Sequence, residues 1–245
     1  MENLAPNPFR GMKVKEGRNI TAIPDILESR PWENFSMIPC KFLKQGENVL
    51  KPKDFQSYIT FQTLRQKAVV NGCATGLGKT VMAYLTYFYY KMKYENTKLI
   101  VVTTASAVLQ YRAEMDKFFE CPELRPLCFK NNMAKQMKLW KINSLTPYAK
   151  ARKFAYDAFS IPYNDMISCN AVFMNYSIFM RDREDIVNAI SKIKKNGDRV
   201  CIILDEAAHF KNLTSQTFKA VYSVTALCDK IIAATAQLII APGPA

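Results

Sequence analysis

The residues CATGLGKT, at positions 73–80, have the types and spacing that bind a nucleotide phosphate. A glycine-bearing turn between a strand and a helix lets backbone N–H groups point at phosphate oxygens, and the positive end of the helix adds to the attraction. Lys79 provides a cation for the β- and γ-phosphates, and the Thr80 hydroxyl is a ligand for Mg²⁺. The segment therefore predicts ATP and Mg²⁺ as cofactors, with a binding loop made of Thr75, Gly76, Leu77, Gly78, Lys79 and Thr80.

The loop departs in one place from the general motif G-x-x-x-x-G-K-[ST], because Cys73 stands where the first glycine is expected. Gly72 lies one residue too early. The alternative interpretation is a glycine-rich loop that only caps a helix. The strand candidate before the loop and the apolar helix candidate after it favour phosphate binding.

A second chemical signal is the acidic end of an apolar run, VCIILDEAAHFKN, at residues 200–212. A carboxylate at a strand end beside a phosphate loop holds Mg²⁺, and a neighbouring carboxylate orients the attacking water. We assign Asp205 to the metal and Glu206 to the water. The alternative is an acidic pair that caps the strand end or the following helix.

The elements that must position these residues alternate along the chain. Nearly continuous apolar runs occur at 68–73, 99–104, 171–176, 199–205 and 230–235, and segments of helical period occur at 79–94, 106–118, 132–158, 177–195 and 214–227. Runs without polar alternation are typical of strands buried on both faces of a parallel sheet. The alternation predicts an α/β fold, a doubly wound and mostly parallel sheet with helices on both faces.

Two regions stand apart from this alternation. Residues 1–50 carry several prolines and no clear period, so they are predicted to be an N-terminal extension that packs on the core lobe or precedes it. Residues 119–168 are long for a crossover and are interpreted as a basic helical insertion in the lobe, which occupies residues 51–245.

These residues resemble the Swi/Snf-like branch of helicase superfamily 2, which is related to the DEAD/DEAH proteins. That branch ends its first motif in G-L-G-K-T, matched by residues 76–80, and its second motif reads D-E-A-H-x-x-K-N. Asp205, Glu206 and Ala207 match the second motif, as do Lys211 and Asn212. Ala208 takes the histidine place, and His209 stands one residue later. The resemblance implies a RecA-like P-loop lobe in which His209 is a candidate for coupling ATP to nucleic acid.

Further pieces resemble the family in its order, over residues 54–237. Gln56 in KDFQ is similar to the upstream glutamine that reads adenine. Residues 99–118 resemble motif Ia and 171–182 resemble motif Ib, which implies nucleic-acid contacts by Thr104, Gln110, Asn175, Tyr176 and Ser177. Thr235 in IIAATA matches motif III and is the other coupling candidate, although Ala233 and Ala236 replace family residues nearby.

Charge supports a polyanionic partner. Lys and Arg number 34 against 21 Asp and Glu, a formal charge of +13, and no acidic residue lies between Glu123 and Asp157. Lys135, Lys138 and Lys141 fall in that stretch with Trp140 and Tyr148 interleaved, which is typical of a nucleic-acid surface. A solvated basic helix surface is the alternative. The Swi/Snf-like resemblance favours double-stranded DNA over RNA.

Cysteine spacing and the length of the apolar runs indicate the kind of compartment in which the chain folds. The seven cysteines have no C-x-x-C pair, residues 1–17 contain no apolar stretch of the kind found in signal peptides, and no run reaches the roughly 18 apolar residues that span a bilayer. We expect a soluble intracellular protein, cytoplasmic or nuclear, with no membrane partner.

The resemblance also implies a second RecA-like lobe, for which nothing remains after Ala236 except QLIIAPGPA. The sequence is therefore expected to be the ATP-binding lobe of a DNA-dependent ATPase, helicase or translocase in a truncated chain. Such a lobe hydrolyses ATP poorly unless a second lobe acts in trans. One alternative is a catalytically weak nucleic-acid-binding module derived from such a lobe. Another is a P-loop protein of a different class, such as a small-molecule kinase or a nucleotide-binding regulator.

Overall fold

The computed structural model describes residues 38–45, 51–124, 126–128, 163–210, 212 and 214–236. Within them lies a six-stranded sheet with the order β1-β6-β5-β2-β4-β3, in which each neighbouring pair is parallel. The strands are β1 (Ala68–Asn71), β2 (Thr97–Thr103), β3 (Pro126–Cys128), β4 (Ala171–Asn175), β5 (Arg199–Leu204) and β6 (Lys230–Ala234). The predicted parallel α/β fold is confirmed.

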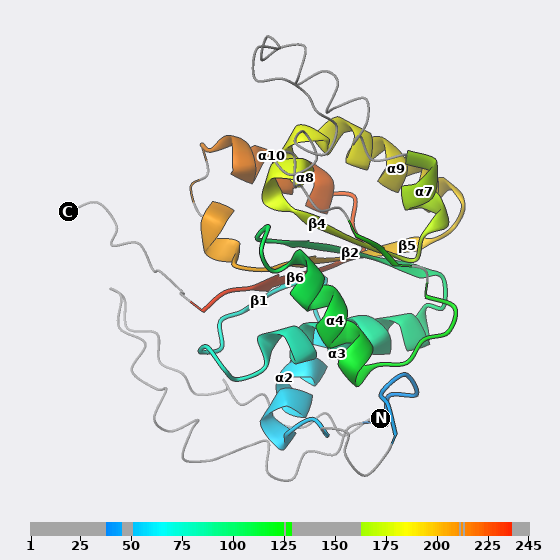
Figure 1. The fold of residues 1–245 in the computed structure, drawn as a ribbon, viewed down its shortest axis with the longest axis vertical. Helices are drawn as coiled ribbons and strands as arrows, with labels where there is room; N and C mark the ends of the chain where they lie inside the picture. Colours follow the sequence, from blue (N-terminus) through cyan, green and yellow to red (C-terminus); the bar gives the residue numbers. More distant parts are fainter. Residues whose placement is uncertain are drawn as a thin grey trace, which may run out of the picture.

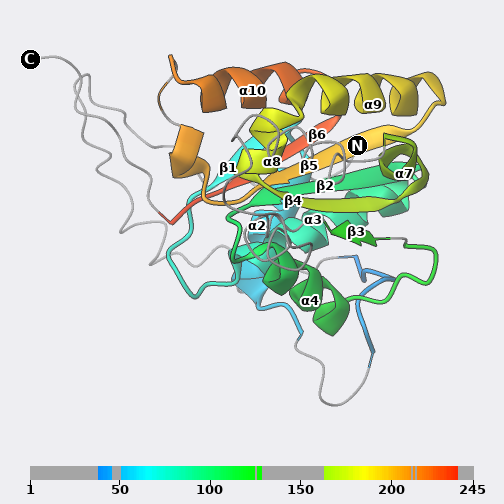
Figure 2. The same ribbon diagram turned by 45° about the horizontal axis from the view of Figure 1, so that its top comes forward.

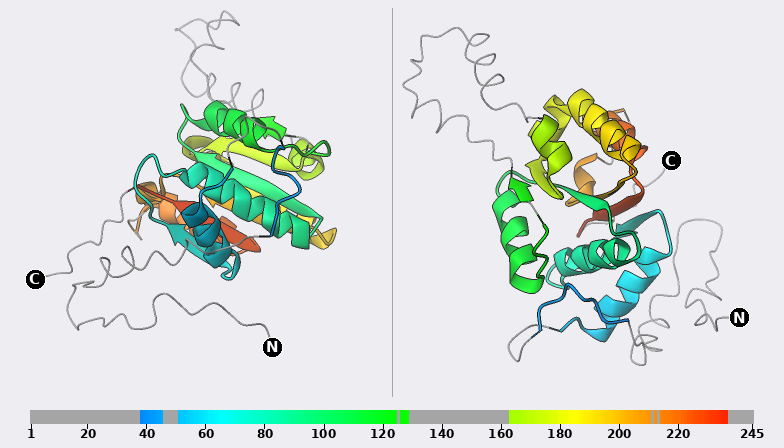
Figure 3. Two further views of the ribbon diagram at one scale, coloured as in Figure 1. Left: turned by 90° about the horizontal axis from the view of Figure 1, so that it is seen from below. Right: turned by 90° about the vertical axis from the view of Figure 1, so that its right-hand side faces the viewer.

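Helices cover both faces of this sheet (Figures 1 and 3). One face carries α2 (Asp54–Leu64), α3 (Lys79–Lys93) and α4 (Val108–Phe118). The other carries α7 (Tyr163–Ser168), α8 (Tyr176–Arg181), α9 (Arg183–Lys195) and α10 (Gln216–Thr225), and the short 3-10 helix η1 (Ala207–Phe210) follows β5. Figure 2 shows α9 and α10 lying along one side of the sheet, with α3 and α4 on the other side. None of the described helices is long and apolar enough to cross a membrane.

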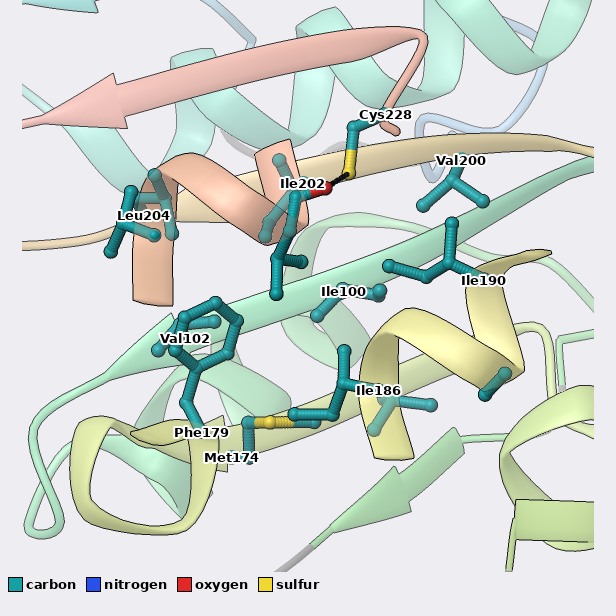
Figure 4. Close-up of a cluster of buried hydrophobic side chains, with 14 of the residues drawn as sticks. Ile100, Val102, Met174, Phe179, Ile186, Ile190, Val200, Ile202, Leu204 and Cys228 are labelled. Carbon is teal, nitrogen blue, oxygen red and sulfur yellow. Dashed lines mark hydrogen bonds between the residues drawn. The ribbon is translucent and has the colours of Figure 1, made fainter. Parts of the chain in front are cut away.

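The central part of each inner strand is apolar because the sheet has a hydrophobic core on each face. Along β2, Leu99 and Val101 pack among the aromatic residues of α3 and α4, whereas Ile100 and Val102 pack against α8 and α9. Figure 4 shows the second core, with Ile100 and Val102 among side chains of β4, β5, α8 and α9. Alternate residues of a strand point to opposite faces, so a strand buried on both sides has few polar positions along its centre.

The five predicted strands are all present, and the helices predicted over 79–94, 106–118 and 214–227 correspond to α3, α4 and α10. The single helix predicted over 177–195 is wrong, because α8 ends at Arg181 and α9 begins at Arg183. The sixth strand, β3, was not expected; its three residues pair with β4 at the edge of the sheet. The helix predicted over 132–158 lies outside the described residues.

Residues 38–45, a described part of the proposed extension, lie against the aromatic core below the sheet. Phe42 is buried, and its ring centroid lies 5.2 Å from that of Phe88 in α3. Phe88 in turn stacks on Phe119 at a centroid distance of 4.5 Å, and Leu43 pairs with Phe119 through a backbone bridge. These contacts place residues 38–45 over the ends of α3 and α4, away from the phosphate loop.

Candidate functional site

The phosphate loop lies between β1 and α3, where the backbone turns sharply. Gly76 has a φ of 83° and Gly78 a φ of 80°, which are backbone conformations that residues with a side chain rarely adopt. Asn71 at the end of β1 supports the start of the loop, since its Oδ1 accepts a hydrogen bond from the Cys73 N–H at 3.1 Å. Gly78 immediately precedes α3, so the free N–H groups of the first helical turn open toward the loop.

The Lys79 ammonium stays at this loop instead of extending into solvent. Its Nζ donates to the Cys73 carbonyl at 3.1 Å and to the Ala74 carbonyl at 3.3 Å. Lys79 is the first residue of α3, and the loop is anchored at its other end by Asn71. The charge is thereby held inside the turn formed by residues 73–78.

Gln56 on α2 contacts the phosphate loop from the side. Its Nε2 donates to the Leu77 carbonyl at 2.9 Å, and its Oε1 accepts from the Lys53 N–H at 3.0 Å. A Cβ at Gly78 would lie 2.5 Å from Gln56 Nε2, so only glycine leaves room for this contact. Gln56, predicted from sequence as a nucleotide-site residue, therefore lies against the loop.

The acidic pair follows β5 at the same edge of the sheet. The Asp205 N–H donates to the Val102 carbonyl at 2.9 Å, and Asp205 Oδ2 accepts from the Thr103 hydroxyl at 2.8 Å. Glu206 has a φ of 49°, the one positive φ among the described non-glycine residues. Strained backbone of this kind persists when the surroundings hold it in place. The Tyr176 hydroxyl provides one such restraint, since it donates to the Asp205 carbonyl at 2.5 Å.

Tyr111 on α4 lies near the acidic pair, and sequence reasoning missed it. The side chain is buried, and the charge of Asp205 acts on its phenol. Burial, followed by the nearby Asp205 charge, raises the pKa of Tyr111 well above its ordinary value, so the phenol stays protonated. A tyrosine on the apolar side of a predicted helix looks like any core residue, so the sequence contained no signal for this position.

Thr235 lies between the phosphate loop and the acidic pair because of the strand order. β6 is inserted between β1 and β5, with Ala234 opposite Asn71 and Ala233 opposite Leu204. Thr235 follows directly, is buried, and donates its N–H to the Asn71 carbonyl at 3.1 Å. For the other coupling candidate, His209, the structure describes only the backbone within η1; Ala208 is half-buried beside it.

The candidate nucleic-acid residues differ in how they lie. Gln110 and Ser177 are exposed on α4 and α8, and Thr104 is half-buried after β2. Asn175 is buried, and its side chain caps α8 by accepting from the Ile178 N–H at 2.9 Å. Tyr176 turns toward Asp205. The basic residues Lys135, Lys138 and Lys141 lie outside the described residues.

This fold and this arrangement of motifs define a class, a RecA-like P-loop lobe of the helicase superfamily 2 type. A family model described as "Type III restriction enzyme, res subunit" matches residues 42–237. The chain belongs to that family, and it is an ATP-binding, helicase-like lobe. No curated protein matches the chain.

Solved structures of helicase-type proteins share the fold. The SWI2/SNF2 ATPase core of Sulfolobus solfataricus, in complex with dsDNA, has a TM-score of 0.54 at 20% identity and covers 84% of this chain. The UvsW helicase of bacteriophage T4 has a TM-score of 0.51 at 14% identity and covers 80% of this chain. This chain spans 35% of the archaeal ATPase core and 56% of the phage helicase.

Proposed function

We propose that this chain binds Mg²⁺-ATP at the carboxyl edge of its sheet and acts as the ATP-hydrolysing lobe of a double-stranded-DNA-dependent ATPase or translocase. The observation that carries the proposal is the meeting of the two motifs at one edge of the sheet, since the phosphate loop follows β1, the acidic pair follows β5, and only β6 lies between these strands. Ligands of open parallel sheets bind at this edge, where several strands end together.

Nucleotide binding is assigned to the phosphate loop and α2. Phosphate oxygens would replace the Cys73 and Ala74 carbonyls as partners of the Lys79 ammonium, because an ionised acceptor binds more strongly than a neutral one. The Gln56 amide lies beside Leu77, where a base bound next to the loop would meet it. This position supports its assignment as the residue that reads adenine.

The acidic pair is assigned to hydrolysis. Thr80 lies in the first turn of α3, and the Asp205 carboxylate is held after β5 by the Thr103 hydroxyl at 2.8 Å. Hydroxyl and carboxylate oxygens are the ligands that Mg²⁺ prefers, so the residues present fit this ion. When bound, Mg²⁺ neutralises charge that develops on the phosphates. Glu206 is the carboxylate next to Asp205, and we assign it to orienting the attacking water.

Double-stranded DNA is the proposed partner. The formal charge of +13 favours a polyanion, and Gln110 and Ser177 are exposed on helices that follow β2 and β4 at the same edge as the ATP site. The archaeal SWI2/SNF2 core, whose fold this chain shares, was solved in complex with dsDNA. A second RecA-like lobe acting in trans is also part of the proposal, because the lobes of the superfamily that this chain resembles work in pairs.

The first test is ATP hydrolysis with and without double-stranded DNA, for the wild-type chain, Lys79→Ala and Lys93→Ala. Lys93 is exposed at the far end of α3 and controls for the loss of a lysine. We expect DNA-stimulated turnover that disappears only in Lys79→Ala. If neither ATP binding nor turnover depends on Lys79, the proposal is wrong.

The second candidate function is a nucleic-acid-binding module with weak chemistry. It is favoured by Ala208, which stands in η1 directly behind the acidic pair where the resembling family has a histidine. This candidate predicts ATP binding that depends on Lys79 but turnover that is unchanged by Glu206→Gln. The comparison of these variants with the wild type separates the two functions.

A further inference from the structure

The Tyr176 side chain begins at the proposed DNA surface and ends at the acidic pair. Tyr176 is the first residue of α8, and its O–H donates to the Asp205 carbonyl at 2.5 Å. Its half-buried ring lies near that of Phe210 in η1, at a centroid distance of 6.1 Å. A phenylalanine would keep the ring contact, so the hydroxyl is the part of the side chain that needs an explanation.

The strand order explains why a long side chain stands at this position. Tyr176 follows β4 and Asp205 follows β5, and β2 lies between these two strands. Neighbouring strands lie about 4.8 Å apart, so the contact spans about two such spacings, or about 10 Å between backbones. A tyrosine with its hydrogen bond bridges that distance, whereas a serine or threonine hydroxyl stays close to its own strand.

The contact acts on the backbone from which Glu206 begins. The Asp205 N–H donates to the Val102 carbonyl at 2.9 Å and its Oδ2 accepts from the Thr103 hydroxyl at 2.8 Å, so β2 holds one side of this residue. Tyr176 holds the Asp205 carbonyl from a helix. That carbonyl and the Glu206 N–H belong to one planar peptide unit, so fixing the carbonyl also fixes the plane next to the φ of 49° at Glu206.

The phenol is suited to a permanent donor role. Burial, followed by the charges of Asp205 and Glu206, raises the pKa of Tyr176 well above its ordinary value. The O–H therefore keeps its proton at neutral pH, and the hydrogen bond to the Asp205 carbonyl persists.

We propose that Tyr176 is a positioning residue that holds the Asp205–Glu206 peptide unit, directs the Glu206 carboxylate, and transmits DNA contact at α8 to ATP hydrolysis. The effect on hydrolysis rests on the proposed function, because that function assigns Glu206 to the attacking water. Ser177, the next residue, is exposed on α8. A shift of α8 on contact with DNA moves the Tyr176 hydroxyl, and with it the peptide unit that carries Glu206.

The experiment compares the wild type with Tyr176→Phe and Tyr87→Phe. Tyr87 is the matched control, since its hydroxyl also donates to a backbone carbonyl, that of Thr97, at the opposite end of β2 from the acidic pair. ATP affinity and the turnover number are measured with and without double-stranded DNA. Amide hydrogen exchange of residues 204–207 is followed by mass spectrometry under the same conditions.

We expect Tyr176→Phe to leave ATP affinity unchanged, to lower the turnover number about fivefold, and to lose the stimulation by DNA. Fivefold is the factor that corresponds to about 1 kcal/mol, the net contribution of one hydrogen bond. Exchange of residues 204–207 should be faster in this variant and no longer respond to DNA. Tyr87→Phe should change none of these quantities.

A second comparison asks whether Tyr176 acts through Glu206. In a Glu206→Gln background, single-turnover rates with and without Tyr176→Phe should be equal, because residues that act as a unit are not additive. An additive loss, or DNA stimulation that persists in Tyr176→Phe, would overturn the inference.

The exchange measurement keeps this inference separate from the proposed function, because it needs no hydrolysis. Equal exchange of residues 204–207 in the wild type and Tyr176→Phe would overturn the inference whether or not the chain hydrolyses ATP. Faster exchange in Tyr176→Phe, in a chain whose ATP binding does not depend on Lys79, would refute the proposed function and leave the contact between Tyr176 and the peptide unit supported.

Discussion

At the scale of single residues, the phosphate loop depends on glycines for two different reasons. Gly76 and Gly78 both have positive φ, but only at Gly78 would a Cβ meet another group, the Gln56 amide at 2.5 Å. Gly197, after α9, has a φ of 85° and open space around it. A substitution at Gly197 therefore measures the cost of backbone strain alone, whereas one at Gly78 measures strain and steric overlap together.

Gly78→Ala should weaken ATP binding at least about tenfold, because the loop must accept both a strained φ and a displaced Gln56. Gly197→Ala should lower the free energy of unfolding by about 1–2 kcal/mol and leave ATP binding unchanged. Urea denaturation and nucleotide titration measure the two effects. Adding Gln56→Ala to Gly78→Ala removes the overlap, and a double variant no more stable than Gly78→Ala would contradict the steric argument.

Glu206 is the residue where proposed chemistry and backbone strain coincide. Glu206→Gln removes the charge and keeps the shape, so we expect ATP binding to persist while turnover falls on the order of 10²-fold or more. Glu206→Asn removes the carboxylate but suits a φ of 49° better, because asparagine tolerates the left-handed region. In urea denaturation, the free energy of unfolding of Glu206→Asn should exceed that of Glu206→Gln by on the order of 1 kcal/mol. Equal stabilities would mean that the turn is unstrained.

The predictable part of the site is the part that follows chemical spacing. Lys79 and Asp205 could be predicted because a phosphate loop and an acidic strand end have few other uses, and the structure brings their motifs to one edge of the sheet. Tyr111 could not be predicted, since the side-chain pattern of α4 does not distinguish a tyrosine deep in the core from one near the charge of Asp205. Asn175 was chosen as a DNA contact, but its polarity is explained by the cap of α8.

At the scale of elements, the central strands β2, β4, β5 and β6 were predictable because both faces of each are mostly buried, which leaves a nearly uninterrupted apolar run. The break between α8 and α9 was not, because the apolar residues on either side of it keep a helical period. The break occurs at Asp182, which is buried and binds the neighbouring Arg181 guanidinium at 2.5 and 2.6 Å. Asp182 is both the C-cap of α8 and the N-cap of α9, so one helix ends and the next begins there without any proline or glycine.

The capping role of Asn175 can be separated from a DNA-binding role. Asn175→Ala should lower the free energy of unfolding by about 1–2 kcal/mol, because the Ile178 N–H loses its acceptor in the core. Asn175→Ser keeps a capping oxygen and should recover most of that loss, without affecting DNA affinity. Ser177→Asp, at an exposed position of the same helix, should instead weaken DNA binding with little effect on stability. The reverse pattern would make Asn175 the DNA contact.

At the scale of the whole molecule, the strand order explains how distant segments meet. The insertion of β6 between β1 and β5 brings the last described strand of the chain between its phosphate loop and its acidic pair. Thr235 is thereby placed beside both motifs although it is far from either in sequence. Sequence order alone predicted the motifs but not this arrangement, since a sheet of parallel strands can be wound in several orders.

Net charge is the other property of the whole molecule, and it leaves open whether the basic segment binds DNA or only faces solvent. If Lys135, Lys138 and Lys141 each contact a phosphate, changing all three to Gln should reduce the slope of log affinity against log salt by about 2.7, at about 0.9 per contact. The matched control replaces Lys93, Lys192 and Lys195, which are exposed at the ends of α3 and α9 away from the ATP site.

Both triple variants remove the same charge, so a general electrostatic attraction would weaken DNA binding equally in the two. We expect only the first to change the slope, because counterion release depends on contacts with phosphates and long-range attraction is screened within about 10 Å at 0.1 M salt. If the slope of log affinity against log salt is the same in the first variant and the wild type, the basic segment faces solvent and does not contact DNA. The DNA surface would then be sought on α4 and α8, where Gln110 and Ser177 are exposed.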